Sequence, residues 1–254
     1  MPMVSHSPKL ISIKQWHYAP KSGNTQGASL MISAVVFDLD GTLAEFNLDV
    51  KAVRAEVMQF LIKQGLPPSV LSIRESIFEM LKKAKIYMKN AGKSDAEFDS
   101  VHKSALSIAR KYELKAARET SLLPGVLETV RALKKRNLKL GVFTINCRDS
   151  AEHILSSLGL KRFFDAIVPR EDVSRVKPDP AHLDATLKAL GVAAEETLVV
   201  GDSIADIVSA KALNVKAVGL ASDDEAAGKL TSAGAAYVIK SIADLTSLVR
   251  GLSS

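Results

Sequence analysis

Short apolar runs alternate with longer amphipathic segments along most of the chain. Runs that are rich in β-branched and other apolar residues predict buried strands at 34–36, 138–143, 166–168, 197–201, 216–219 and 236–239. Apolar residues at helical spacing predict helices between and after them, at 126–136, 150–158, within 178–190, and at 204–213, 224–233 and 242–248. Strands that alternate with single helices indicate an α/β fold with a doubly wound parallel sheet.

Residues 49–120 follow a different pattern, because they are rich in Lys, Glu, Ala and Leu and show only helical spacing. Three apolar stripes predict three helices, the second of which begins after Pro67-Pro68 and ends near Gly92. The stripes are Val50, Val53, Val57, Phe60 and Leu61; Leu71, Ile73, Ile77, Leu81 and Ile86; and Phe98, Val101, Ala105, Ile108 and Tyr112. Because about 70 residues is too long for an ordinary crossover, we expect a helical domain inserted into the sheet.

These patterns divide the chain into three parts. We expect residues 31–48 and 121–254 to form the α/β core and residues 49–120 to form a helical cap. Residues 1–30 are rich in Ser, Pro, Gly and Asn and lack the continuous apolar run of a secretory signal. We predict that they form a disordered arm, with Met31 as a candidate natural start.

Composition narrows the class of protein. The 254 residues are 47% hydrophobic, which suits a sizeable core, and the lone Cys147 excludes an intramolecular disulfide. A reducing compartment fits, so we expect a cytoplasmic protein. No apolar run approaches the roughly 18 residues that would span a membrane.

The net charge of +6 raises the question of nucleic-acid binding. The surplus lies in residues 1–30 and in residues 49–120, which carry 14 basic and 9 acidic side chains, whereas residues 121–254 carry 17 and 16. Only 5% of residues are aromatic, so base-stacking platforms are not indicated. We therefore expect no nucleic-acid partner and a surface that attracts a small anionic molecule.

Polar residues follow several predicted strands where those strands end. Asp38 and Asp40 follow the first, and taken alone they could be solvated aspartates in a turn at Gly41. Thr144, Lys177, Asp202 and Asp206 come after later strands, and each alone could serve as a cap, a filler or a surface residue. Together they supply what phosphoryl transfer needs: a carboxylate nucleophile, a proton donor, acids for Mg²⁺, a cation and a hydroxyl group.

The order of these residues resembles the four motifs of the haloacid dehalogenase (HAD) superfamily, in its phosphatase branch and close to phosphoglycolate-phosphatase-like proteins. Phe37–Leu43 matches the first motif, Thr144 the second, Lys177–Pro180 the third and Gly201–Ile207 the fourth. The inserted helices resemble the superfamily's C1-type cap. The resemblance implies a Rossmann-like core and a Mg²⁺-dependent phosphatase acting on a small phosphorylated metabolite, of the phosphoglycolate or sugar-phosphate class.

The resemblance also implies a role for each motif residue. Asp38 would attack phosphorus and become the aspartyl-phosphate, and Asp40 would act as the acid and then the base. Thr144 and Lys177 would hold the phosphoryl group, together with Gly41. The implied metal ligands are Asp38, Asp40, Asp202 and Asp206. Two departures from the family pattern are Ile145, which displaces the usual Asn by one position to Asn146, and Glu45, where Asp often stands at the cap hinge.

Two other functions remain open from the sequence. A phosphomutase of the β-phosphoglucomutase type shares the same motifs. A non-catalytic protein that uses the fold for binding is disfavoured, because binding alone has no need for both Asp38 and Asp40. The sequence leaves open the substrate and whether the protein is a monomer or a dimer.

Overall fold

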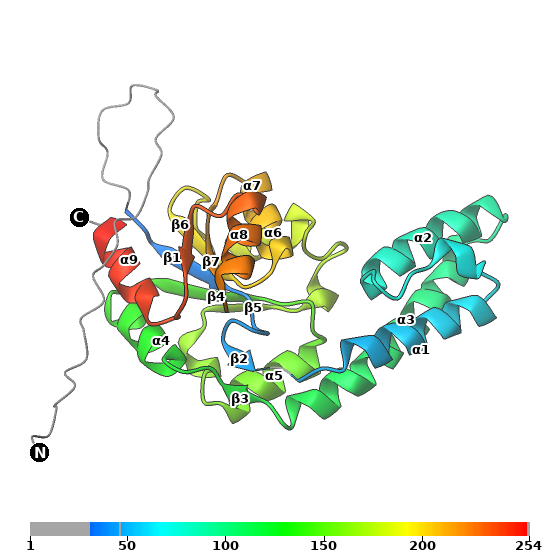
Figure 1. The fold of residues 1–254 in the computed structure, drawn as a ribbon, viewed down its shortest axis with the longest axis horizontal. Helices are drawn as coiled ribbons and strands as arrows, with labels where there is room; N and C mark the ends of the chain where they lie inside the picture. The colour runs from blue at the N-terminus through cyan, green and yellow to red at the C-terminus, as the bar shows by residue number, and fades with distance from the viewer. Residues whose placement is uncertain (1–30, 46, 253–254) are drawn as a thin grey trace, which may run out of the picture.

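The computed structural model describes residues 31–45 and 47–252, and within them a six-stranded parallel sheet lies between two layers of helices (Figure 1). Its strands are β1 (Ala34–Phe37), β4 (Lys139–Phe143), β5 (Ala166–Val168), β6 (Thr197–Gly201), β7 (Lys216–Leu220) and β8 (Tyr237–Ile239). They lie side by side in the order β5-β4-β1-β6-β7-β8. The predicted doubly wound parallel α/β fold is thus confirmed.

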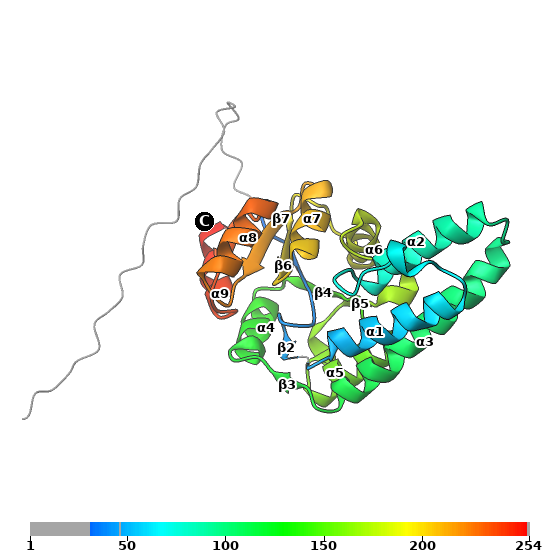
Figure 2. The same cartoon turned by 45° about the vertical axis from the view of Figure 1, so that its right-hand side comes forward.

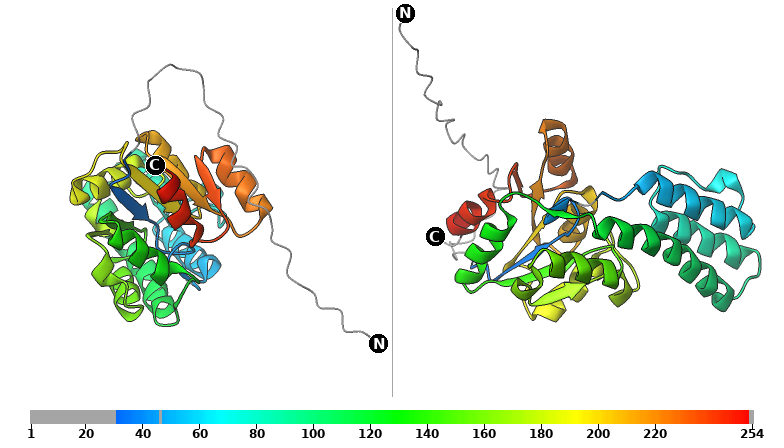
Figure 3. Two further views of the ribbon diagram at one scale, coloured as in Figure 1. Left: turned by 90° about the vertical axis from the view of Figure 1, so that its left-hand side faces the viewer. Right: turned by 90° about the horizontal axis from the view of Figure 1, so that it is seen from below.

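Alternation along β1 gives the sheet two buried faces. Val35 and Phe37 pack in one apolar cluster, whereas Ala34 and Val36 pack in the other. The first face is covered by α4 (Val126–Lys135), α5 (Arg148–Ser157) and α9 (Asp244–Leu252). The second is covered by α6 (Pro180–Leu190), α7 (Ile204–Ala212) and α8 (Asp224–Ala233), as Figure 3 shows. A strand buried on both faces must be apolar at every position, which explains the runs in the sequence.

Strand β1 lies at the topological switch point of the sheet: β4 and β5 follow on one side of it, and β6, β7 and β8 follow on the other. It pairs with β4 on one side and with β6 on the other, both in parallel. Chains of this topology leave a crevice at the carboxyl ends of the strands where the order reverses. Asp38, Thr144 and Asp202 each follow one of these three strands directly, so the sheet carries them to one edge.

The helical insertion leaves and re-enters the core through a short two-stranded sheet. Strand β2 (Ala44–Glu45) leads out and β3 (Ser121–Leu122) leads back, and the two pair antiparallel. Between them lie α1 (Val50–Lys63), the 3₁₀ turn η1 (Pro68–Val70), α2 (Ile77–Asn90) and α3 (Asp95–Ala117). These helices project to one side of the sheet and enclose an apolar cluster of their own (Figures 1 and 2).

Helix α3 connects the apolar cluster of the inserted helices to the cluster on the first face of the sheet. It begins at a capping box in which Ser94 and Glu97 satisfy each other's backbone N–H groups. Near its start, Phe98 and Val101 are buried in the cluster of the inserted helices, whereas Ala117 at its end belongs to the cluster of the core. One continuous helix therefore reaches from the insertion to the sheet.

Some details of the insertion differ from the prediction. The second helix begins at Ile77 rather than near Leu71, because the Ser76 hydroxyl accepts the Glu79 N–H and caps it there. Ile73 lies in the preceding turn and is exposed, and Val50 and Ile86 are exposed as well, so they are not part of the buried stripes. The small residues Ala84 of α2 and Ala109 of α3 are instead buried in the apolar cluster of the inserted helices. The predicted arm lies outside the described residues.

The remaining short elements are the 3₁₀ turns η2 (Lys161–Phe163) and η3 (Arg170–Asp172), on either side of β5. Strands β2 and β3 were not expected from the sequence, because two residues are too few to establish an alternating pattern. Within residues 31–45 and 47–252, no helix has the length and apolar character that a membrane span requires.

Candidate active site

Lys177 lies at the centre of the polar groups at this edge of the sheet. Its Nζ is 2.5 Å from Oδ1 of Asp38 and 2.6 Å from Oδ1 of Asp206. The ammonium also lies 4.4 Å from the centre of the Phe143 ring. Burial lowers the pKa of Lys177, but the charges of Asp206 and Asp38 outweigh it and raise the pKa above its usual value. Lys177 is therefore a permanent buried cation.

Asp206 is held by the first turn of its own helix. Its Oδ2 accepts the backbone N–H of Ser203 at 3.0 Å and the Ser203 hydroxyl at 2.5 Å, which forms the capping box of α7. Its Oδ1 accepts from Lys177. A Cβ on Gly201 would overlap the Asp206 side chain, so glycine is required where β6 ends. The sequence around Asp206 thus fixes the carboxylate that holds the lysine.

Asp38 and Asp40 follow the same strand but have different partners. Oδ1 of Asp38 accepts the Leu39 N–H at 2.7 Å in addition to the bond from Lys177. Asp40 instead accepts a hydrogen bond from the side-chain amide of Asn146, with Nδ2 3.0 Å from Oδ1. The two carboxylates therefore face different surroundings.

Burial raises the pKa of both carboxyl groups. Burial raises the pKa of Asp38 well above its usual range against the pull of Lys177, and the charges of neighbouring aspartates add to the rise. Burial also raises the pKa of Asp40, to about 7, although Lys177 and the hydrogen bond from Asn146 work against it. A carboxyl group with a pKa near 7 can both donate and accept a proton at neutral pH.

Three carboxylates converge where a metal ion could bind. Asp38, Asp202 and Asp206 each offer an oxygen, and these oxygens lie within 4.8 Å of one another. Asp202 is exposed. Its pKa is nevertheless raised to about 6, first because the surrounding protein reduces its hydration and second because Asp206 is negatively charged. Of these three carboxylates, Asp38 and Asp206 also contact the ammonium of Lys177, which supplies one positive charge. Hard oxygen donors with excess negative charge fit a cation such as Mg²⁺.

Gly41 allows Asp202 to approach the turn after β1. Its φ of +72° is in the left-handed region, and a Cβ at this position would overlap the Asp202 carboxylate. Its N–H donates to the Ala44 carbonyl at 2.9 Å. The positive φ and the overlap of a Cβ with Asp202 together make glycine the residue that this turn requires.

Thr144 is fully buried at the end of β4. Its N–H donates to the Val168 carbonyl at 3.1 Å, and its hydroxyl oxygen accepts the N–H of Asn146 at 3.1 Å. This arrangement fixes the backbone of Asn146 and leaves the hydroxyl hydrogen of Thr144 as a donor.

Two side chains that contact the motif residues have no role assigned from the sequence. Asn146 follows the second motif by two positions, and its proximity to Asp40 could be suspected only from the displaced asparagine. His182 lies behind Lys177: its Nε2 is 3.0 Å from the Val168 carbonyl, and its Nδ1 accepts the Lys177 N–H at 3.4 Å. Nothing in the sequence around His182 distinguishes it from a core residue on α6.

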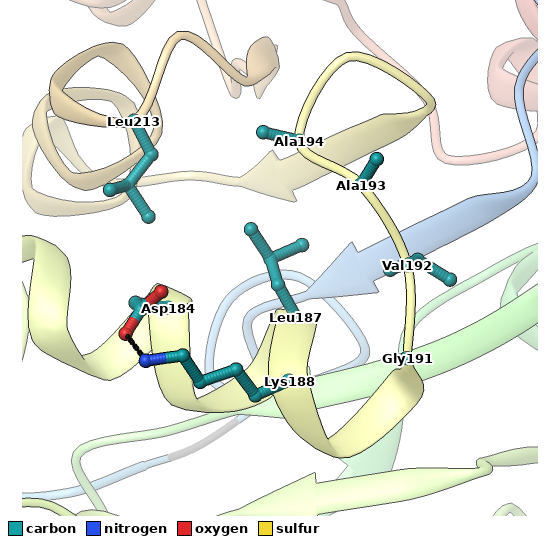
Figure 4. A pocket seen from close by; sticks show the side chains of 8 residues that line it. All are labelled: Asp184, Leu187, Lys188, Gly191, Val192, Ala193, Ala194 and Leu213. Carbon is teal, nitrogen blue, oxygen red and sulfur yellow. Dashed lines mark hydrogen bonds and ion pairs between the residues drawn. The ribbon is translucent and has the colours of Figure 1, made fainter.

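Two surface hollows differ in their relation to the site. One, of about 430 Å³, is lined by Gly41 and Asp202 and by residues that follow β7 and β8. The other, of about 520 Å³, lies between the end of α6 and the start of β6, at the opposite edge of the sheet (Figure 4). Its charged lining is the Asp184–Lys188 ion pair, so the polar chemistry of the motifs is absent there.

Comparison with known proteins shows the family to which the chain belongs. The family model described as haloacid dehalogenase-like hydrolase matches residues 35–220. The chain belongs to this family. This HAD hydrolase is similar to the pyrophosphatase PpaX of Bacillus velezensis, with 30% identity over 220 residues that cover 84% of this chain and 94% of that protein.

Two further comparisons extend the likeness. Phosphoglycolate phosphatase 1 of Pseudomonas aeruginosa is 29% identical over 191 residues, which cover 73% of this chain and 68% of that protein. The crystal structure of a hydrolase from Pseudomonas syringae aligns with a TM-score of 0.59 and 27% identity, covering 87% of this chain and all of that one. The likeness in sequence and in fold thus extends over 73% to 87% of this chain.

The close approach at Gly41 yields a stability prediction. We expect Gly41→Ala to cost more free energy of unfolding than Gly65→Ala, although both glycines have positive φ, because a Cβ on Gly65 meets nothing within 4 Å. The control should lose about 1–2 kcal/mol from backbone strain alone. Gly41→Ala should lose at least about 1 kcal/mol more from the overlap. Urea unfolding of the metal-free proteins measures both, and equal losses would contradict the overlap.

The burial of His182 yields a prediction about pH. Burial lowers its pKa to about 4, so between pH 6.5 and 4 the unfolded chain binds a proton at this residue that the folded chain does not. Stability must then fall as the pH falls through this window. Relative to His182→Gln, the wild type should lose on the order of 2–3 kcal/mol between pH 7 and pH 4. Denaturant unfolding at several pH values tests this, and parallel stability curves would refute it.

Proposed function

We propose that this HAD hydrolase is a Mg²⁺-dependent phosphatase that hydrolyses a small phosphorylated metabolite through an aspartyl-phosphate on Asp38. The observation that carries the proposal is that Asp38 and Asp40, which both follow β1, have different hydrogen-bonding partners. Asp38 is bonded to the Lys177 ammonium, whereas Asp40 is bonded to the neutral amide of Asn146. One carboxylate is thereby suited to attack, and the other to carry a proton.

In the first step an oxygen of Asp38 attacks phosphorus and forms a new P–O bond, while the bond from phosphorus to the leaving oxygen breaks. Both hydrogen bonds to Asp38 fall on Oδ1, which leaves Oδ2 for the attack. Asp40 gives its proton to the leaving oxygen, as a carboxyl group with a pKa of about 7 can do near neutral pH. Lys177 reduces the repulsion between Asp38 and the anionic substrate.

In the second step the ionised Asp40 takes a proton from water, and the water oxygen attacks the same phosphorus atom. The P–O bond to Asp38 breaks, so the Asp38 carboxylate is restored and inorganic phosphate leaves. The Thr144 hydroxyl, whose oxygen already accepts from the Asn146 N–H, donates to a phosphoryl oxygen. Gly41 gives Asp202 room at the same site.

Asp38 and Asp202 would hold Mg²⁺ through their carboxylates, and the main-chain carbonyl of Asp40 would supply a further ligand. Asp206 offers an oxygen within the same cluster, but both of its oxygens already accept hydrogen bonds, Oδ1 from Lys177 and Oδ2 from Ser203, so we assign it to the outer shell. When bound, the ion would neutralise charge that develops on the transferred phosphoryl group.

We also propose that the two parts of the chain have different functions. Residues 31–48 and 121–254 would act as the catalytic core, and residues 49–120 as a cap that selects the part of the substrate beyond its phosphate. The relatives named pyrophosphatase PpaX and phosphoglycolate phosphatase 1 support a small phosphorylated substrate. A cytoplasmic location suits a fold whose single cysteine is buried and unpaired.

The nucleophile assignment is tested by turnover of p-nitrophenyl phosphate with Mg²⁺. We expect Mg²⁺-dependent turnover in the wild type and a loss of roughly 10³-fold or more in Asp38→Asn, because the amide is a poor nucleophile. Asp184→Asn is the matched control, since Asp184 is partly exposed and lines the hollow at the opposite edge of the sheet, and it should retain full activity. A wild type without metal-dependent turnover would overturn the phosphatase proposal.

If the wild type is active, a panel of phosphorylated metabolites, ranked by kcat/KM, would identify the substrate class.

The metal assignment has a test that needs no turnover. A ligand that binds only the folded state adds about 2.7 kcal/mol at a hundred times its Kd, and each kcal/mol shifts the Tm of a protein of this size by roughly 2–4 °C. Mg²⁺ should therefore raise the Tm of the wild type by several degrees, and Asp202→Asn should remove most of that rise. A Tm that Mg²⁺ leaves unchanged would show that the acidic cluster does not hold the ion.

A further inference from the structure

Two charged side chains outside the acidic cluster are buried against each other. Glu113 lies near the end of α3, and Arg170 begins η3 just after β5. Arg170 Nη1 and Glu113 Oε1 form an ion pair whose side chains are only 3% and 6% exposed. Removing two charges from water is costly, so such a pair is weak evidence for stability. Its contacts indicate another role.

Glu113 and Arg170 together hold three successive residues of the loop that follows β4. Glu113 Oε2 accepts the Cys147 N–H at 3.0 Å, and Arg170 Nη1 donates to the Ile145 carbonyl at 3.1 Å. The backbone N–H of Arg170 donates to the Asn146 carbonyl at 3.3 Å. The carboxylate also lies at the N-terminus of α5, where negative charge is favourable.

Asn146 is the residue of this loop that touches the acid–base carboxylate. Its side-chain amide donates to Asp40, its N–H is bonded to Thr144, and its carbonyl is bonded to Arg170. A rotation of the backbone at Asn146 would withdraw the amide from Asp40. The orientation of Asp40 therefore depends on bonds that Glu113 and Arg170 make one residue away on either side.

Joining α3 to α5 does not by itself require a buried pair. Arg110 and Asp149 form an exposed ion pair between the same two helices, with side chains 51% and 56% exposed. Within the part of the chain that the structure describes, the side chains of that pair form no hydrogen bond with the loop from Thr144 to Cys147. The two links thus provide a comparison: both tie α3 to α5, and only the buried one reaches the loop.

We propose that Glu113 and Arg170 are positioning residues, which fix Asn146 against Asp40 and so couple α3 of the helical insertion to the acid–base step. The proposal rests on the proposed function, because it assumes that Asp40 transfers protons in phosphate-ester hydrolysis. Since α3 also carries Phe98 and Val101 of the insertion's apolar cluster, movement of the inserted helices reaches Asp40 through Glu113.

A double-mutant cycle on kcat tests the coupling. We expect Glu113→Gln to lower kcat about tenfold in the wild-type background and less than about twofold in an Asn146→Ala background, because its effect passes through Asn146. KM should stay within about threefold, since neither residue contacts the phosphoryl group. Asp149→Asn, which breaks the exposed link between the same helices, should leave kcat unchanged. Equal losses from Glu113→Gln in both backgrounds would overturn the proposal and indicate a purely structural role.

A second variant guards against a failure to fold. Glu113→Leu/Arg170→Met removes both charges and leaves neither unpaired, a replacement that buried pairs often tolerate. We expect it to fold, as judged by its Tm, and to lose at least as much kcat as Glu113→Gln. A folded double variant with full activity would refute the positioning role. Wild-type turnover is measured alongside, so its absence would reject the phosphatase proposal instead.

A measurement without substrate gives an independent readout. In the metal-free protein, amide hydrogen exchange of a peptide that covers residues 144–147 should be about tenfold or more faster in Glu113→Gln, because the Cys147 N–H loses an ionised acceptor. The same peptide in Asp149→Asn should exchange as in the wild type. Equal exchange in all three proteins would show that Glu113 does not hold the loop.

Discussion

The buried ammonium of Lys177 is the constraint on which the rest of this site depends. It contacts Asp38 at the end of β1 and Asp206 on α7, so one charge joins the strand at the centre of the sheet to the helix after its neighbour. Leaving either carboxylate buried without this cation would be costly. Phe143 and His182 surround the lysine with an aromatic face and a neutral imidazole, which adds no competing charge.

The parts of the fold that the sequence predicts are those with a repeating physical cause. Strands β1 and β6 are buried at every position, which explains their apolar runs, whereas the outer strands β5 and β8 are predicted from shorter apolar runs and are only partly buried. Helical spacing predicts the inserted helices, but it does not predict all of their buried positions correctly. Ala84 and Ala109 fill close contacts there, whereas the larger Ile73 and Ile86 face solvent. Size and hydrophobicity alone do not reveal which side of a helix meets a neighbour.

The candidate site was predictable to the extent that its residues follow strand ends. Asp38, Thr144 and Asp202 lie at one edge of the sheet because parallel strands bring their carboxyl ends together. The contact of Asn146 with Asp40, and the pairing of Glu113 with Arg170, depend on how side chains from distant segments are oriented. Only the displaced asparagine of the second motif points to the first contact, and no spacing along the chain points to the second.

The short β2–β3 pair also bears on how the chain reaches its fold. Strand β1 must pair with β4 across the entire insertion, and the entropy of closing such a loop opposes that pairing. The contacts among α1, α2 and α3 are local in sequence, and they bring Ala44 opposite Leu122. Once these helices associate, the loop that separates β1 from β4 is effectively short. The insertion thus lowers the entropic barrier that its own length creates, and assembly of the central strands can follow it.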